Sequence, residues 1–148
     1  MIITYNQADG TVEQVSTNDL SAIESADIEE AMGGTAWRVI EDQLRGQDPT
    51  AMRAVLWAVR RRTEPTAKFS EFDVPGWRRR LRARLEREEI DDVFENLMAE
   101  ALAASEDSAI ESMLPFLRKL AEDTGDIEAA LDALGKGHLV RDPAGSED

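Results

Sequence analysis

The only histidine, the paired carboxylates and the arginine clusters are the residues of this chain that could do chemistry. A catalytic nucleophile or a metal site needs several specific partners at short range. His138 has no second histidine, and the chain has no cysteine, so thiolate metal sites and disulfides are excluded. His138 also lies in a segment that we expect to be a disordered tail. We therefore predict that it is neither a catalytic base nor a metal ligand.

The carboxylates are abundant but form no recognisable site. Glu29-Glu30, Glu88-Glu89 and Asp91-Asp92 occupy ordinary solvated positions of predicted helices. Their spacing differs from that of a calcium-binding loop, which alternates oxygen ligands around a central glycine. The neighbouring glycines Gly33 and Gly34 follow a predicted helix, so they indicate a helix C-cap and not a phosphate-binding loop. We predict no enzymatic activity, no bound metal and no cofactor.

The arginines near aromatic residues are better candidates, because protein interfaces favour tryptophan and arginine. Trp57 lies outside the main apolar stripe of its predicted helix, beside Arg53, Arg60 and Arg61. Trp77 precedes the run Arg78-Arg79-Arg80. The candidate protein-binding residues are Trp57, Arg60, Arg61, Phe72 and Trp77. The alternative interpretation is that another part of the same fold covers Trp57, while the arginines form ion pairs with the chain's own carboxylates.

The net charge of −14 is unevenly distributed along the chain. Residues 60–87 carry 10 basic and 4 acidic side chains, whereas residues 88–148 carry 4 basic and 17 acidic side chains. Such an arginine-rich segment either forms ion pairs with its acidic flanks and faces solvent, or binds nucleic acid. The surrounding negative charge would weaken binding to nucleic acid, so we do not expect a nucleic-acid partner.

Hydrophobic periodicity and capping motifs predict most of the secondary structure. Two β-rich runs joined by Asp9-Gly10 predict a β-hairpin over residues 1–16. Capping boxes at Ser21–Glu24 and Ser108–Glu111 each predict the start of a helix. Thr35 is expected to cap the next helix, Ala36–Arg45. Asp48-Pro49 predicts an N-cap followed by proline at the first helical position, before the helix Thr50–Arg62. A last helix is predicted over Ile127–Leu134.

The segment Arg78–Ala104 contains neither glycine nor proline, so one long helix is allowed there. Its apolar face rotates, however, and its charge changes sign between Arg87 and Asp91. We therefore predict a break near Glu88–Asp92.

These elements predict a mainly α fold, with a small N-terminal β-hairpin followed by a compact bundle of about five or six helices. We expect a single domain over residues 1–135, with helices between 21 and 134, and a disordered tail over residues 136–148. No apolar run reaches the length of a membrane span or of a signal peptide. We therefore expect a soluble protein without a membrane partner.

The first half of the chain contains a characteristic order of motifs. A helix ends at Gly33-Gly34, followed by Thr35-Ala36-Trp37 and Asp48-Pro49. The most characteristic part is the helix with Trp57 and Arg60-Arg61, followed by Phe69-Ser-Glu-Phe-Asp-Val74. In these motifs the segment Trp37–Val74 resembles the tail assembly chaperones of long-tailed phages that infect actinobacteria. The resemblance covers roughly residues 1–75, and the arginine-rich and acidic segments beyond Pro75 match no family that we can name.

The resemblance implies a non-catalytic assembly factor of the host cytoplasm. Such proteins bind the hydrophobic tape-measure protein, assist assembly of the tail tube around it, and are absent from the mature virion. Tail-tube subunits, a longer frameshifted form of the chain and further copies of itself are additional candidate partners. Gly135-Lys136 is a dipeptide that a slippery heptamer could encode.

Two other classes of function stay open. One is a structural or connector protein that remains in the virion. The other is a small DNA-binding regulator that uses the arginine-rich segment 60–87.

Overall fold

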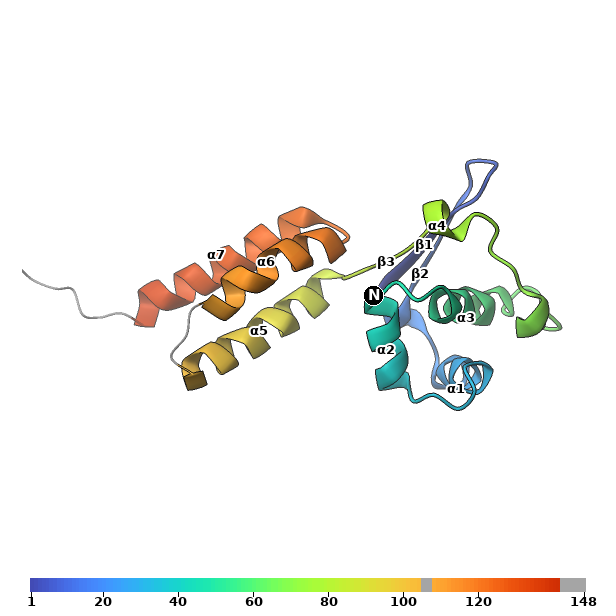
Figure 1. Ribbon diagram of the computed structural model, residues 1–148, viewed down its shortest axis with the longest axis horizontal. Coiled ribbons are helices and arrows are strands. Elements are labelled where there is room, and N and C mark those ends of the chain that lie inside the picture. The colour runs from blue at the N-terminus through green and yellow to red at the C-terminus, as the bar shows by residue number, and fades with distance from the viewer. Residues whose placement is uncertain (105–107, 142–148) are drawn as a thin grey trace, which may run out of the picture. The chain divides into compact units, whose positions relative to one another are not determined.

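A computed structural model describes the backbone of residues 1–104 and 108–141, and the side chains of residues 1–100 and 110–134 (Figure 1). The chain is mainly helical with a small antiparallel sheet near its N-terminus, which confirms the predicted fold class. The single domain expected over residues 1–135 instead divides into two compact units, Met1–Arg84 (unit 1) and Leu85–Asp148 (unit 2). Each unit has its own set of buried apolar side chains.

The sheet of unit 1 has the strand order β2-β1-β3, and both pairings are antiparallel. Strands β1 (Ile2–Asn6) and β2 (Val12–Ser16) form the predicted hairpin. Gly10 lies in its turn with φ 89°, a conformation that glycine adopts without strain. The Asp9 carboxylate stabilises the turn by accepting a hydrogen bond of 2.8 Å from the Thr11 amide.

The third strand, β3 (Leu81–Arg84), lies inside the segment where a helix was predicted, so that prediction is wrong. Leu81 and Ala83 are buried on one face of the sheet, whereas Arg82 and Arg84 lie on the other. The alternation has a period of two, and pairing with β1 over a long sequence separation favours the strand over a helix.

The chain therefore leaves the helical conformation earlier than expected. A short helix α4 (Trp77–Arg80) precedes β3, and α5 (Arg87–Ala104) follows it. Helix α5 runs continuously through residues 88–92, so the break predicted near Glu88–Asp92 is misplaced. The helical conformation is interrupted by β3 and resumes only at Arg87.

Three helices of unit 1 follow the hairpin: α1 (Ala22–Ala31), α2 (Trp37–Arg45) and α3 (Pro49–Arg60). The capping box of Ser21 and Glu24 is present, and the Asp48 carboxylate caps α3 by accepting from the Ala51 amide. The prediction that Thr35 caps α2 is wrong. Its hydroxyl donates to the Met32 carbonyl, and Ala36 is the N-cap residue.

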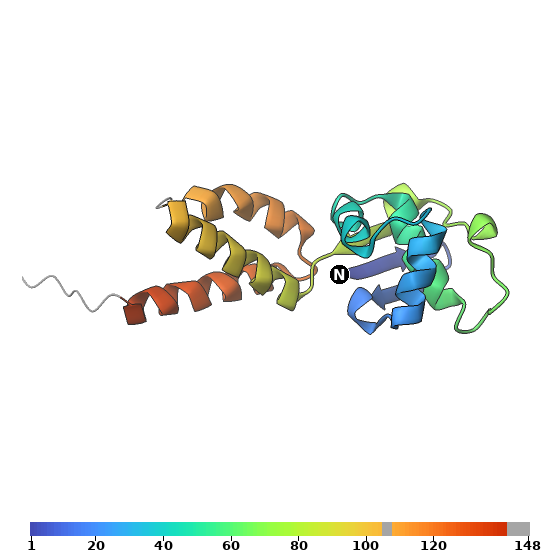
Figure 2. The same ribbon diagram turned by 90° about the horizontal axis from the view of Figure 1, so that it is seen from below.

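Helix α3 contacts all three strands, and α1 and α2 pack beside it (Figures 1 and 2). The face of the sheet that carries Ile3, Val15 and Ala83 is buried. Short 3₁₀ helices, η1 (Thr17–Asp19) and η2 (Phe69–Glu71), lie in the connections. The core of unit 1 includes Ile28, Ile40, Leu44, Met52, Val55, Leu56 and Leu81.

Unit 2 consists of α5, α6 (Ser108–Leu120) and α7 (Thr124–Arg141). Each of its helices contacts the other two. A parallel bridge joins Leu85 to Ala121, where the Leu85 amide donates to the Leu120 carbonyl and the Glu122 amide donates to the Leu85 carbonyl. Among the described residues, its buried side chains are Leu85, Ile90, Phe94, Leu117, Leu120, Ala121, Ile127 and Ala130.

Helix α7 continues past Gly135, where the sequence predicted an end, and includes His138. The disordered tail predicted from residue 136 is therefore wrong for residues 136–141, and residues 142–148 lie outside the described part. A glycine within a helix costs only about 1 kcal/mol relative to alanine, which neighbouring residues can offset. Gly135 alone was therefore a weak stop signal.

Candidate protein-binding surface

Trp57, the first of the predicted binding residues, is buried by the segment that follows its own helix. Its side chain is 7% exposed, and its indole Nε1 donates a hydrogen bond of 2.9 Å to the Ala67 carbonyl. The Phe69 ring meets it edge to face, with 5.4 Å between ring centroids. The alternative interpretation, in which the fold itself covers Trp57, therefore describes the structure.

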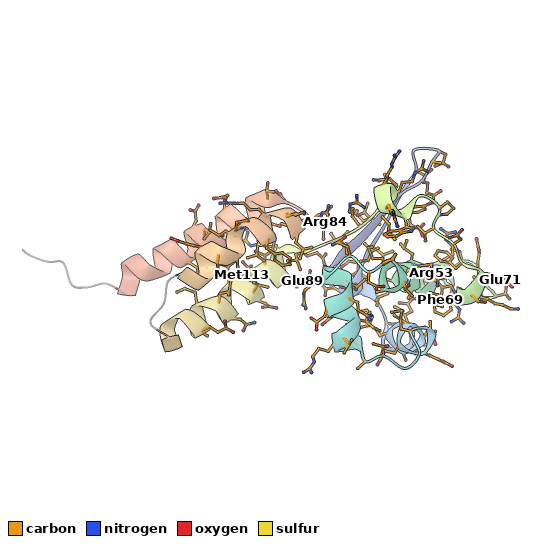
Figure 3. All side chains as sticks on the ribbon, in the orientation of Figure 1. Arg53, Phe69, Glu71, Arg84, Glu89 and Met113 are labelled. Carbon is orange, nitrogen blue, oxygen red and sulfur yellow. The ribbon has the colours of Figure 1, made fainter. Side chains whose placement is uncertain are left out.

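Arg53 holds the same segment in place. Its Nη1 donates to the carbonyls of Phe69 and Phe72 at 2.7 and 2.8 Å. Its guanidinium carbon lies 3.9 Å from the centroid of the Phe69 ring, and the two residues lie together in Figure 3. Arg53 was not among the predicted site residues, although its position four residues before Trp57 places both on one face of α3.

The arginines at the end of α3 form ion pairs within unit 1. Arg60 Nη2 lies 2.7 Å from Glu13 of β2, and Arg61 Nη1 lies 3.1 Å from Asp27 of α1. Each also lies near a ring, because the Arg60 guanidinium is 5.5 Å from Phe72 and that of Arg61 is 5.0 Å from Trp57. These contacts connect α3 to the hairpin, to α1 and to its own following loop.

A further ion pair joins Arg62 to Glu24 of the α1 capping box, with 2.6 Å between Nε and Oε1. The hydrogen bond from Arg62 lowers the pKa of Glu24 to about 2, with help from the Ser21 amide. Since the capping box is part of this network, charge and helix capping act on the same carboxylate.

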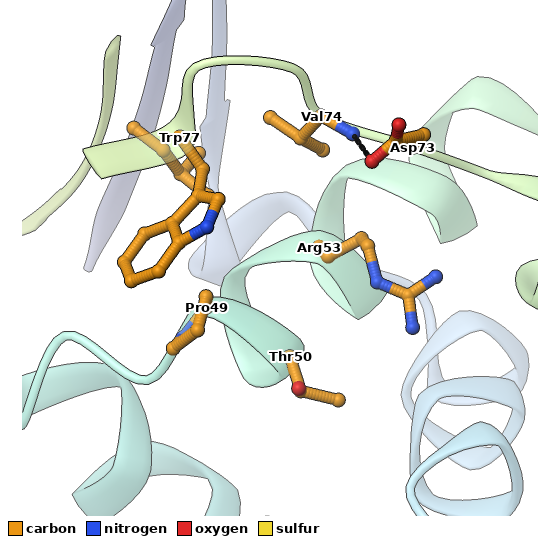
Figure 4. Close-up of a pocket in the computed structure, with 7 residues that line it drawn as sticks. Pro49, Thr50, Arg53, Asp73, Val74 and Trp77 are labelled. Atoms are coloured by element: carbon orange, nitrogen blue, oxygen red, sulfur yellow. Dashed lines mark hydrogen bonds between the residues drawn. The ribbon is translucent and has the colours of Figure 1, made fainter. Parts of the chain in front are cut away.

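Trp77 is 37% exposed, whereas Trp57 is only 7% exposed. Gly76, with φ 69°, caps the short helix α4 and places the indole at a groove of about 240 Å³. The indole faces Pro49, whereas the Arg53 guanidinium points away from it (Figure 4). The groove is lined by Pro49, Thr50, Arg53, Asp73, Val74, Trp77 and Leu81.

The groove is smaller than the roughly 300–1,000 Å³ of typical small-molecule sites, so it suits one large side chain of a partner. The Asp73 carboxylate at its edge already accepts from the Val74 amide at 2.8 Å. The sequence indicated Trp77 but missed Pro49 and Thr50, which come from the first turn of α3. Only the tertiary fold brings them beside Trp77.

The arginines that follow Trp77 form a second group, Arg78, Arg79, Arg80, Arg82 and Arg84. Among the residues that the structure describes, none of the five lies within ion-pair distance of a carboxylate. Arg82 Nη1 donates to the carbonyls of Arg78 and Leu81, and Arg84 Nη1 donates to that of Ala83. These arginines therefore differ from Arg60, Arg61 and Arg62, each of which forms an ion pair inside unit 1.

The described residues contain no group of three or more histidine, cysteine, aspartate or glutamate side chains that could hold a metal ion. Within the same residues, no helix is long and apolar enough to cross a membrane.

Comparison with known proteins found no matching family model, no matching curated protein and no matching solved structure.

Proposed function

We propose that this chain is a non-catalytic tail assembly chaperone of a long-tailed phage, and that it binds the tape-measure protein in the host cytoplasm. The observation that carries the proposal is Trp77, which is 37% exposed at a groove of about 240 Å³ and is followed by arginines that form no ion pair with a described carboxylate. An exposed tryptophan next to arginines is the composition of an interface anchor.

The residues that resemble the chaperone family also support the proposal. They all lie in unit 1, where Trp57, Phe69 and the arginines of α3 contact one another. These contacts fix the segment between α3 and α4, and this segment contributes Asp73 and Val74 to the groove. The conspicuous residues of the motif thus position the groove without themselves being the contact surface.

The acidic surface of unit 2 suits the same role. Residues 85–148 carry 18 acidic and 5 basic side chains, so a complex with a hydrophobic client would retain a large net negative charge. Like charge between complexes opposes aggregation. The chain would therefore keep the client soluble while the groove of unit 1 provides the attachment.

Co-expression with the tape-measure protein of the same phage tests the proposal. We expect the full chain to keep that protein soluble and to be retained in a pull-down. Trp77→Ala should weaken the complex by about 2 kcal/mol, roughly a thirtyfold loss of affinity, as removal of an interface anchor does. Phe116→Ala is the matched control, because Phe116 is an exposed aromatic residue of unit 2 and is 50% exposed.

Equal binding by Trp77→Ala and wild type would remove the groove from the binding surface. Failure of the wild type to bind or solubilise the client would contradict the chaperone proposal itself. Abundant copies of the chain in purified particles, measured by mass spectrometry, would favour a virion structural or connector protein instead.

A DNA-binding regulator remains the second candidate, because the arginines of residues 78–84 lack carboxylate partners within the described structure. A mobility shift at physiological salt that weakens steeply as salt rises would support it. The tail-tube subunits and a frameshifted longer form stay candidate partners for the same pull-down.

A further inference from the structure

The outer face of the small sheet carries the arginines that lack carboxylate partners. Arg82 and Arg84 lie opposite Thr4 and Ile2 of β1 in the strand register, on the face away from α3. The side chains of Ile2, Thr4, Arg82 and Arg84 are half-buried, whereas the other face of the sheet carries buried residues. This face thus combines two positive charges with an apolar residue.

Both guanidinium groups keep donors that the structure leaves unused. Backbone carbonyls accept from Nη1 of each arginine, at 2.6 and 2.8 Å for Arg82 and 3.1 Å for Arg84. Among the described residues, Nε and Nη2 of these two arginines make no hydrogen bond. Since carbonyl contacts fix the orientation of each group, the remaining donors are held in place for an acidic ligand.

Helix α5 carries a stripe of exposed carboxylates whose charge is opposite to that of Arg82 and Arg84. Glu88, Asp92 and Glu95 are exposed and follow the spacing i, i+4, i+7, so they lie on one face of the helix. Ile90 and Phe94, which are buried in unit 2, lie on the opposite face. In the described part of the chain, these three carboxylates form no ion pair.

The spacings of the two charge sets agree. Alternate residues on a strand are about 6.6–6.8 Å apart, which applies to Arg82 and Arg84. Residues four apart on a helix rise about 6 Å, which applies to Glu88 and Asp92. A helix aligned with β3 can therefore place one carboxylate near each guanidinium, with Ile2 beneath it.

We propose that Arg82 and Arg84 of one copy bind the α5 stripe Glu88, Asp92 and Glu95 of a second copy. The charges favour this occupant, because unit 1 has 12 basic and 13 acidic side chains whereas unit 2 has 5 basic and 18 acidic. The contact is heterologous, since the two surfaces differ, so the chain associates head to tail. It extends the proposed chaperone function but does not depend on the Trp77 groove.

Sedimentation equilibrium of the full chain tests this association. The wild type should show an average mass that rises with concentration at about 50 mM NaCl. The association constant should fall at least about tenfold at about 500 mM NaCl, since the Debye length shortens from roughly 14 to 4 Å. A monomer at all concentrations in low salt would overturn the proposal.

Charge-reversed variants identify the two surfaces. Arg82→Glu/Arg84→Glu should be monomeric alone, and so should Glu88→Lys/Asp92→Lys. An equimolar mixture of the two variants should associate again, because each supplies the surface that complements the other. Association of either variant alone at wild-type strength, or no association in the mixture of folded variants, would contradict the assignment.

Two controls separate this contact from other effects. Arg38→Glu/Lys68→Glu changes the net charge as much as Arg82→Glu/Arg84→Glu and alters exposed residues of unit 1 elsewhere, so it should associate like wild type. Trp77→Ala should also associate normally, so that failure of client binding and failure of self-association appear in different variants. A mobility shift with duplex DNA that Arg82→Glu/Arg84→Glu abolishes, without self-association, would assign the arginines to nucleic acid and overturn the proposal.

Discussion

The two units of this chain use charged residues in opposite ways. In unit 1, the arginines of α3 and of the two positions after it bind carboxylates and carbonyls from other segments, so charge connects elements of the fold. Among the described residues of unit 2, ion pairs join Arg87 to Asp91 and Asp126, and Arg118 to Glu128. Most of the carboxylates that the structure describes in unit 2 lie at exposed positions around an apolar core.

This difference shows that the charge of the whole chain describes neither unit. Unit 1 is nearly neutral, with 12 basic and 13 acidic side chains, whereas unit 2 accounts for nearly all of the net charge of −14. The negative net charge of the chain therefore argues against binding of an anionic partner, such as nucleic acid, only at unit 2. It does not argue against such binding at β3 and α4 of unit 1. Directional contacts should determine the stability of unit 1, and charge repulsion should matter more in unit 2.

The largest expected effect comes from Trp57→Ala. The change removes a buried indole, its hydrogen bond to Ala67 and its contact with Phe69. The free energy of unfolding of unit 1 should fall by about 3–5 kcal/mol. All three tryptophans lie in unit 1, so fluorescence during urea denaturation reports this unit, while circular dichroism reports the helices of both.

Phe116→Ala is the comparison for this prediction, because it removes an exposed ring from unit 2 and should change stability by less than about 1 kcal/mol. Simultaneous loss of the fluorescence and circular dichroism signals of Trp57→Ala, at one urea concentration, would show that the units unfold together. The contrast between the units would then not extend to their stability.

Arg53→Met should have the next largest effect. Methionine keeps the apolar stem but loses the hydrogen bonds to the Phe69 and Phe72 carbonyls and the contact with the Phe69 ring. We expect a loss of about 2–3 kcal/mol in the free energy of unfolding of unit 1, since charged hydrogen bonds contribute more than neutral ones. Arg38→Met, at an exposed position of α2, should change it by less than about 0.5 kcal/mol under the same fluorescence measurement.

The sequence predicted the elements of unit 1 whose signals are local. The turn at Asp9-Gly10, the capping box at Ser21 and the start of α3 at Asp48-Pro49 each depend on a few neighbouring residues, and each is confirmed. Strand β3 was missed because its partner β1 lies far away in the sequence. The alternation of Leu81-Arg82-Ala83-Arg84 was visible, but four residues within an arginine-rich run do not distinguish a strand from a helix.

The candidate site was predictable only in part, for the same reason. The composition singled out Trp57, Arg60, Arg61 and Phe72, but it could not show that the loop after α3 folds back over that helix. Trp77 was identified, whereas Pro49 became its neighbour only through the tertiary fold. In unit 2, the sequence predicts that the last helix ends before Gly135, but α7 continues through this glycine to Arg141.

Glu24→Gln should have a smaller effect that depends on pH. Glutamine preserves the capping-box spacing and removes the charge, so the change isolates the ion pair with Arg62. The pKa of Glu24 is about 2 in the folded chain and lies below the ordinary value of 4.5, so the ionised form stabilises the fold above pH 4.5. Because Arg62 is half exposed, we expect a contribution of about 0.5–1 kcal/mol at pH 7.

The difference between Glu24→Gln and the wild type should shrink as pH falls from about 5 to about 2, because the wild-type carboxylate becomes protonated. Urea denaturation followed by fluorescence at several pH values measures it. A difference that stays constant down to pH 2 would assign the effect to the cap and not to the charge.

Salt should have the smallest effect, and its sign should separate the two units. Raising NaCl from about 20 mM to about 500 mM screens repulsion among the carboxylates of unit 2, so its free energy of unfolding should rise by up to about 1 kcal/mol. In unit 1 the same change weakens the ion pairs of Arg60, Arg61 and Arg62, so its free energy of unfolding should stay level or fall slightly.

Amide hydrogen exchange at Phe94 of α5 and at Val55 of α3 reports each unit in one sample, and the Arg82→Glu/Arg84→Glu background removes any contribution from self-association. Replacing Glu88, Asp92 and Glu95 by their amides should reduce the response of unit 2, because these carboxylates lie along one exposed face. Equal stabilisation of both units would point to a general effect of salt on hydrophobic burial, and the electrostatic contrast between them would then be wrong.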